Sequence, residues 1–124
     1  MQPLYVVLLQ SDAQVAEKLA SAFSNTSCTV HLAGSLMELH RLLAQHECCK
    51  VILDMEAASL PEVQHVCKQF PRTSVVCTHR LADEAMWTAA MNAGAVDIHA
   101  SSDIPAIVRS TIGSVSPVRN VAAA

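Results

Sequence analysis

Glycine and aromatic residues are scarce in this chain of 124 residues. The three glycines, Gly34, Gly94 and Gly113, lie far apart in the sequence, which excludes a glycine-rich loop that cradles phosphate groups. Aromatic residues make up only 3% of the chain, too few for the stacking surfaces with which proteins bind single-stranded nucleic acids. Two common kinds of nucleotide-binding site are therefore missing.

Positive charge and long apolar runs are also in short supply. Eight lysine and arginine residues stand against eleven aspartate and glutamate residues, for a net charge of −3. This balance does not favour binding to nucleic acid or to an anionic membrane. No apolar run approaches the roughly 20 residues needed to cross a bilayer. The first residues also lack the basic region of a signal peptide. We therefore expect a cytoplasmic protein without direct nucleic-acid or membrane binding.

The cysteines are odd in number, which argues against a disulfide framework. The five are Cys28, Cys48, Cys49, Cys67 and Cys77. In a chain without a secretion signal they predict reduced, mostly buried thiols. His46 and the adjacent cysteine pair have the wrong spacing for a zinc site. Cys77 and His79 would share a strand face, but a third group to orient them is not evident, so we expect no enzyme.

Apolar residues make up 52% of the chain and fall into alternating patterns of two periods. Short apolar runs predict strands at residues 4–9, 28–32, 49–54, 74–78 and 96–99. Helical spacing and capping residues predict helices at about 12–23, 35–45, 61–69, 83–94 and 104–115. This alternation predicts a flavodoxin-like (βα)5 three-layer sandwich with a parallel sheet of order 2-1-3-4-5. Residues 1–115 would form the domain and residues 116–124 a linker or disordered tail.

An acid ends the central predicted strand. The apolar run at 51–53 stops at Asp54, and the first strand stops at Gln10, Ser11 and Asp12. In open α/β folds the site lies beyond the carboxyl ends of the strands, where the strand order reverses. That point falls between the first and third strands. We therefore expect Asp54 to face the residues that follow the first strand.

In order and spacing these features resemble the receiver domain of two-component response regulators, over nearly the whole chain. The resemblance rests on Asp54, on Thr78 at the end of the fourth strand, and on Ala-Met-Asn-Ala-Gly-Ala-Val-Asp at 90–97. It implies that Asp54 stands where a histidine kinase phosphorylates such domains. It also implies that Thr78 is the hydroxyl that turns towards the phosphoryl group.

Three other positions depart from the family pattern. Gln10 and Ser11 match the two acids that help to hold Mg²⁺, together with the carbonyl of the residue matched by Glu56. Ser101 matches the lysine that pairs with the phosphoryl oxygens. Mg²⁺ prefers carboxylate oxygens, and phosphoryl transfer depends on neutralising the equatorial oxygens. These departures predict a degenerate phospho-acceptor pocket around Asp54, without a cofactor.

We favour a pseudo-receiver, which would act by binding a signalling protein such as a histidine kinase or an output domain, or by forming a homodimer. The alternative is a receiver phosphorylated on Asp54, with Mg²⁺ held weakly by Asp54, Asp12 and Glu56, that controls an output domain outside this chain. A third class, a flavodoxin-like ligand binder or small enzyme, is disfavoured because a glycine-rich loop and a base–nucleophile pair are missing.

Two further groups of residues have more than one explanation. His79 and Arg80 would lie near Asp54 and could replace the missing lysine charge, although a solvated loop pair is the simpler explanation. Trp87 is expected to pack into the core, but if exposed it would be the best anchor for a partner. With Met91 and Ile98, which replaces the family's aromatic switch residue, it forms our candidate interface.

Overall fold

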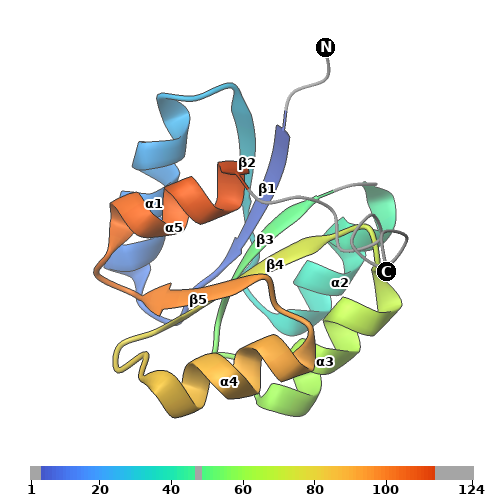
Figure 1. Ribbon diagram of the computed structural model, residues 1–124. Helices are drawn as coiled ribbons and strands as arrows, with labels where there is room; N and C mark the ends of the chain where they lie inside the picture. The colour runs from blue at the N-terminus through green and yellow to red at the C-terminus, as the bar shows by residue number, and fades with distance from the viewer. Residues whose placement is uncertain (1–3, 47–48, 114–124) are drawn as a thin grey trace.

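The computed structural model describes residues 4–46 and 49–113. Five strands and five helices alternate in this part of the chain (Figure 1). The strands are β1 (Leu4–Leu9), β2 (Cys28–Leu32), β3 (Lys50–Asp54), β4 (Ser74–His79) and β5 (Asp97–Ala100). The helices are α1 (Ala13–Ser24), α2 (Leu36–Gln45), α3 (Leu60–Gln69), α4 (Glu84–Ala93) and α5 (Ile104–Gly113). The expected tail at 116–124 and the last residues of the expected final helix lie outside the described residues.

The five strands form one parallel sheet of order β2-β1-β3-β4-β5, which confirms the predicted topology. In this sheet β2 and β5 are the edge strands. The helices α1 and α5 cover one face, and α2, α3 and α4 cover the other (Figure 1). The register pairs Leu9 with Leu53 and Asp54 with Thr78, so β1, β3 and β4 end at nearly the same level. The polar residues that follow them therefore meet at one edge.

Alternation along the central strands builds two apolar layers. Val6, Leu8 and Ile52 point towards α1 and α5, and they pack in one cluster with Leu19, Phe23 and Ile107. Val7 and Leu9 belong to the larger cluster on the other side, which includes apolar residues of α2, α3 and α4. Strands that are buried on both faces have nearly continuous apolar sequences. These strands could therefore be predicted from the sequence.

The helices begin at the polar residues that their sequences predict. Asp12, Ser35 and Asp83 cap α1, α2 and α4, each accepting a hydrogen bond from a backbone N–H of the first turn. The third helix begins one residue before the expected Pro61, because Ser59 caps it in a reciprocal pair with Glu62. These hydrogen bonds to Ser59 lower the pKa of the Glu62 carboxyl.

Gly94 ends α4 in the left-handed conformation, with φ of 112°, as its position in the sequence predicts. The site is also crowded, because a Cβ atom at this position would lie 2.8 Å from Cβ of Cys67 in α3. Glycine is thus required both by the backbone and by the close approach of α3 to the end of α4.

The buried side of α4 differs from the expected one. Ala90 is fully buried, and Met86 and Ala93 pack against the same cluster, so the core stripe follows positions 86, 90 and 93. Trp87 lies beside that stripe and is 48% exposed, so its predicted packing into the core is wrong. Ile98 is only 6% exposed and belongs to the core, so its place in the candidate interface is also wrong.

Among the described helices, none is long and apolar enough to span a membrane.

Candidate functional site

A crevice lies where the carboxyl ends of β1 and β3 meet. It has a volume of about 410 Å³ and is lined by Gln10, Ser11, Asp12, Ala13, Val15, Asp54, Glu56, Arg80 and Ser101. Six of the seven predicted pocket residues thus lie around one cavity. The seventh, Thr78, is fully buried beneath it, paired in register with Asp54. The sheet topology brings these residues together, since they come from four segments that are distant in sequence.

Asp54 is 2% exposed, and both oxygens of its carboxylate accept hydrogen bonds. Ser11 donates to Oδ2 twice, from its backbone N–H at 2.9 Å and from its hydroxyl at 2.5 Å. The backbone N–H of Glu56 donates to Oδ1 at 2.8 Å. The carboxylate therefore joins the β1–α1 loop to the end of β3. A group attached to either oxygen would have to displace one of these donors.

Gln10 links three strands through its side-chain amide. Its Nε2 donates to the carbonyl oxygen of Ile52 in β3 at 3.4 Å. Its Oε1 accepts a hydrogen bond of 3.2 Å from the Thr78 hydroxyl in β4. The Thr78 hydroxyl is thus bonded to Gln10 rather than to Asp54. Gln10 is thus a neutral group that cross-links the sheet.

Asp12 and Glu56, the substitute metal ligands of the alternative hypothesis, each have another partner. Oδ1 of Asp12 accepts the Gln14 N–H at 2.8 Å, as a helix cap does. The two carboxylate oxygens of Glu56 lie 3.1 and 2.9 Å from Nε of Arg80. Within residues 4–46 and 49–113, no three histidine, cysteine, aspartate or glutamate side chains are grouped to hold a metal ion. Beside the Asp54 carboxylate, Gln10 and Ser11 offer only neutral oxygens.

Arg80 lines the crevice. This agrees with the less favoured of the two explanations, in which the loop after β4 brings positive charge near Asp54. The Arg80 side chain is 76% exposed and paired with Glu56, so part of its charge is already compensated. An exposed pair of this kind contributes roughly 0–1 kcal/mol to stability. His79, in contrast, accepts the Leu81 N–H at Nδ1, 2.9 Å away, and does not line the crevice.

Ser101, which the resemblance matches with the family's lysine, directly follows β5. Its backbone N–H donates to the carbonyl oxygen of His79 at 3.1 Å, and the residue is only 7% exposed. Within the described part of the chain, its hydroxyl has no hydrogen-bond partner. It also borders a second cavity of about 370 Å³, lined by Asp12, Gln14, Val15, Lys18, Arg80, Ser101, Ser102 and Ile104.

None of the four cysteines that the structure describes forms a disulfide bond, which agrees with the prediction of reduced thiols. Burial raises the pKa of the Cys77 thiol to about 12, with smaller contributions from Cys67 and Asp54. Burial likewise raises the pKa of the Cys67 thiol to about 11. Both groups therefore stay protonated at neutral pH, and a protonated thiol is a poor nucleophile. This agrees with setting aside a Cys77–His79 nucleophile. Cys48 lies outside the described residues.

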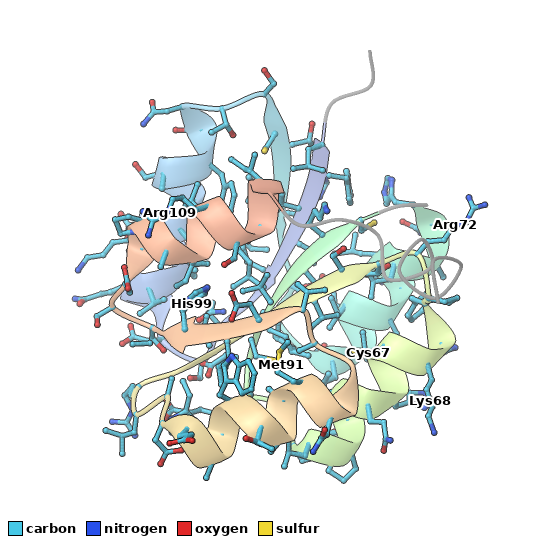
Figure 2. The ribbon with its side chains drawn as sticks, in the orientation of Figure 1. Cys67, Lys68, Arg72, Met91, His99 and Arg109 are labelled. Carbon is cyan, nitrogen blue, oxygen red and sulfur yellow. The ribbon has the colours of Figure 1, made fainter. Side chains whose placement is uncertain are left out.

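A second polar cluster, which the sequence did not reveal, joins β5 to α5. Nε2 of His99 lies 2.5 Å from the Ser110 hydroxyl and 3.2 Å from Oδ2 of Asp97. The Ser110 hydroxyl donates to the same Asp97 oxygen at 3.0 Å. Figure 2 shows His99 on β5, facing α5. The acid and the serine share one ring nitrogen, whereas a catalytic triad needs them on opposite nitrogens, so this cluster is structural.

Comparison with known proteins finds similarity in structure only. No family model and no curated protein matches the sequence. A response regulator from Thermotoga maritima has a TM-score of 0.79 and 19% identity, over 91% of this chain and 100% of its own. The receiver domain of the putative response regulator NarL from Mycobacterium tuberculosis has a TM-score of 0.80 and 18% identity, over 91% and 96%.

A third structure is a response regulator protein from Burkholderia pseudomallei with a phosphorylated aspartic acid, calcium ion and citrate. It has a TM-score of 0.77 and 17% identity, over 97% of this chain and 73% of its own. At such low identity these similarities establish the fold. The chain has the flavodoxin-like fold of response regulator receiver domains, which confirms the resemblance at the level of structure.

Proposed function

We propose that this protein is a signalling module with a degenerate receiver pocket, which acts through contacts with other proteins rather than through phosphorylation of Asp54. The observation that carries the proposal is the hydrogen bonding of Asp54. Its carboxylate is buried and bonded to Ser11 and Glu56, and those neutral donors hold it as part of the structure. In this role Asp54 fixes the loop between β1 and α1.

The charges around the crevice support the same proposal. A phosphoryl group would add a charge of about −2 at neutral pH. Lysine is replaced by Ser101, the two metal acids are replaced by Gln10 and Ser11, and the guanidinium of Arg80 is paired with Glu56. A phosphorylated Asp54 would therefore lack most of the groups that neutralise its oxygens.

The proposed partners are a signalling protein, such as a histidine kinase or an output domain outside this chain, or a second copy of it, in the cytoplasm. The half-exposed Trp87 on α4 supports a contact surface there. The partly buried Met91, which is labelled in Figure 2, lies one turn further along the helix. Exposed tryptophan is enriched among the residues that dominate protein interfaces.

The phosphorylation half of the proposal is tested by incubating the protein with Mg²⁺ and acetyl phosphate, and separately with beryllium fluoride. We expect no gain in intact mass and no change in Trp87 fluorescence. A base-labile mass gain that disappears in Asp54→Asn would overturn the proposal and establish the alternative, a phosphorylated receiver. As a positive control, the triple variant Gln10→Glu, Ser11→Asp, Ser101→Lys restores the missing charges and should gain a Mg²⁺-dependent response.

The contact surface is tested by sedimentation at high protein concentration. If the module pairs with itself through α4, Trp87→Ala weakens the dimer at least tenfold, because a central tryptophan contributes 2 kcal/mol or more, roughly, to binding. Met37→Ala is the matched control, since Met37 is 82% exposed on α2, which lies elsewhere on the surface. A monomer at all concentrations would leave a different protein as the partner and exclude the second copy.

A further inference from the structure

We infer that His40 on α2 and His65 on α3 together bind a zinc ion at the surface of the protein, with water completing its coordination. The two helices cover the same face of the sheet (Figure 1). Neither histidine lines the crevice beside Asp54. The inference therefore goes beyond the proposed function and does not depend on it.

The two imidazole rings lie close together although they come from different helices. Their centroids are 5.3 Å apart, and their planes are inclined by 46°. Zinc binds histidine nitrogens at about 2.0–2.1 Å and prefers a tetrahedral arrangement of ligands, so two imidazoles that share one ion have centroids roughly 5 Å apart. The observed separation of His40 and His65 matches that of two ligands of the same ion.

The ring nitrogens of both histidines are available to a ligand. Within the described part of the chain, neither ring has a hydrogen-bond partner. His65 is exposed and His40 is partly exposed, so a hydrated ion can reach both rings from solvent. Neutral imidazole is the commonest metal ligand among side chains and can bind through either nitrogen. Zinc is the ion that this ligand type and the spacing of the rings favour.

Phe70 holds the His40 ring close to α3. The centroids of these two rings are 5.7 Å apart, and their planes are inclined by 52°. Phe70 follows the last residue of α3 and packs against the larger apolar cluster. The His40 ring thus contacts two side chains of the α3 segment, which limits its rotamers. A ligand whose rotamer is already limited loses less conformational entropy when the ion binds.

The charges near the two rings are balanced. On α3, Glu62 lies about one turn before His65 and Lys68 about one turn after it. The pKa of the Glu62 carboxyl is lowered by hydrogen bonds at the helix cap, so this group is ionised at neutral pH and offsets Lys68. On α2, Arg41 is paired with Glu38. Since the described residues group no third histidine, cysteine or carboxylate with the pair, water fills the other positions and the affinity is modest.

The test is a titration of the full chain, labelled with ¹⁵N-histidine, by zinc chloride at neutral pH with the cysteines kept reduced. Long-range ¹H–¹⁵N spectra report each histidine ring separately. We expect the rings of His40 and His65 to respond together, with one dissociation constant on the order of 10–100 µM, because two protein ligands supply about half of what a structural zinc site has. EDTA should reverse the response. Mg²⁺, which prefers oxygen ligands, should cause none.

Changes at either histidine should weaken the binding. His40→Asn and His65→Asn each remove one ligand, so each should raise the dissociation constant about tenfold or more and abolish the response of the remaining ring. His65→Cys puts a thiolate ligand in place of the imidazole and should keep the response of His40. Because His65 is exposed, its variants remain informative if a change at the partly buried His40 disturbs folding.

His31→Asn is the matched control, because it removes an imidazole from a second pair of histidines. The rings of His31 and His46 pack against Tyr5, with centroids 4.5 and 3.8 Å from its ring, and their own centroids are 6.1 Å apart. The control should leave the dissociation constant unchanged.

The inference is overturned if the rings of His40 and His65 do not respond to zinc, or if they titrate with different dissociation constants. It is also overturned if His31→Asn weakens binding as much as His65→Asn does, or if the zinc response is confined to other histidines or to cysteines. The phosphodonor measurement on Asp54 is separate, so each proposal can fail without the other.

Discussion

The ends of β3 and β5 lie at the same edge of the sheet, yet their polar residues are in opposite situations. Asp54 at the end of β3 has a hydrogen bond to each oxygen and is held by a loop on either side. Ser101 at the end of β5 is nearly as buried, and its hydroxyl has no partner in the described part of the chain. Both oxygens of Asp54 thus accept hydrogen bonds from the protein, whereas the Ser101 hydroxyl has none within the described residues.

This difference shows that residues at one edge of a sheet can differ widely in their hydrogen bonding, although the same sheet geometry places them. The register that places Asp54 beside Thr78 is set by apolar strands, which do not depend on the polar residues at their ends. Gln10 and Ser11 form neutral hydrogen-bond cross-links at this edge, to Ile52 and to Asp54.

Among the changes at the ends of β3 and β5, Asp54→Ala should have the largest effect on stability. The change leaves the N–H groups of Ser11 and Glu56 without their acceptor, so we expect a loss of about 3 kcal/mol in the free energy of unfolding. Urea denaturation followed by circular dichroism measures it. Asp54→Asn keeps one acceptor oxygen and should lose about half as much. If Asp54→Ala is as stable as the wild type, the carboxylate is not the anchor that we describe.

Ser11→Ala is expected to have the next largest effect. It removes the hydroxyl that donates to Oδ2 of Asp54 but keeps the backbone donor, so the expected loss is about 1 kcal/mol. The same denaturation experiment applies. A double-mutant cycle with Asp54→Ala should show that the two effects are not additive, because they remove the same interaction. Strict additivity would mean that the two side chains act independently.

Arg80→Gln should matter less for folding than the changes at Asp54 and Ser11. Its pair with Glu56 is exposed, so we expect a loss of about 0.5 kcal/mol, which high salt should reduce further in the wild type. Thermal unfolding at low and high ionic strength measures both effects. A large, salt-independent loss would show that the pair is buried more deeply than in this structure.

Ser101→Ala should have the smallest effect on stability. Because the hydroxyl has no partner in the described part of the chain, its removal is expected to change the free energy of unfolding by less than about 0.5 kcal/mol in either direction. Chemical denaturation beside the Ser11→Ala variant makes the contrast direct. A loss as large as that of Ser11→Ala would mean that the Ser101 hydroxyl has a structural partner, and the comparison between β3 and β5 would fail.

The sequence predicted the fold closely because its signals are local and redundant. The bounds of β1 and β2 agree with the structure, and Ser35 and Gly94 mark helix ends through chemistry that needs no tertiary contact. The position of Trp87 was missed for a physical reason. Alanine residues lie on several sides of α4. The spacing of apolar residues therefore does not distinguish the core stripe from Trp87 beside it.

The pocket was predicted as a set of residues but not as a network. Strand order alone brings Asp54 and Ser11 together, whereas the hydrogen bond between them depends on rotamers that a sequence pattern does not encode. The pairing of Glu56 with Arg80 joins two loops 24 positions apart. The cluster of Asp97, His99 and Ser110 has one local sign, the alternate positions 97 and 99, but its serine comes from the following helix.

Gly94 controls how closely the end of α4 packs against α3. Because Gly94 has no side chain, the end of α4 can lie directly against Cys67 of α3. A Cβ atom at this position would be too close to Cys67. Even one methyl group there would act as a wedge. It would push the end of α4 away from α3 and shift the half-exposed Trp87, which lies about two turns before Gly94. The position of Trp87 therefore depends on how closely the far end of α4 approaches α3.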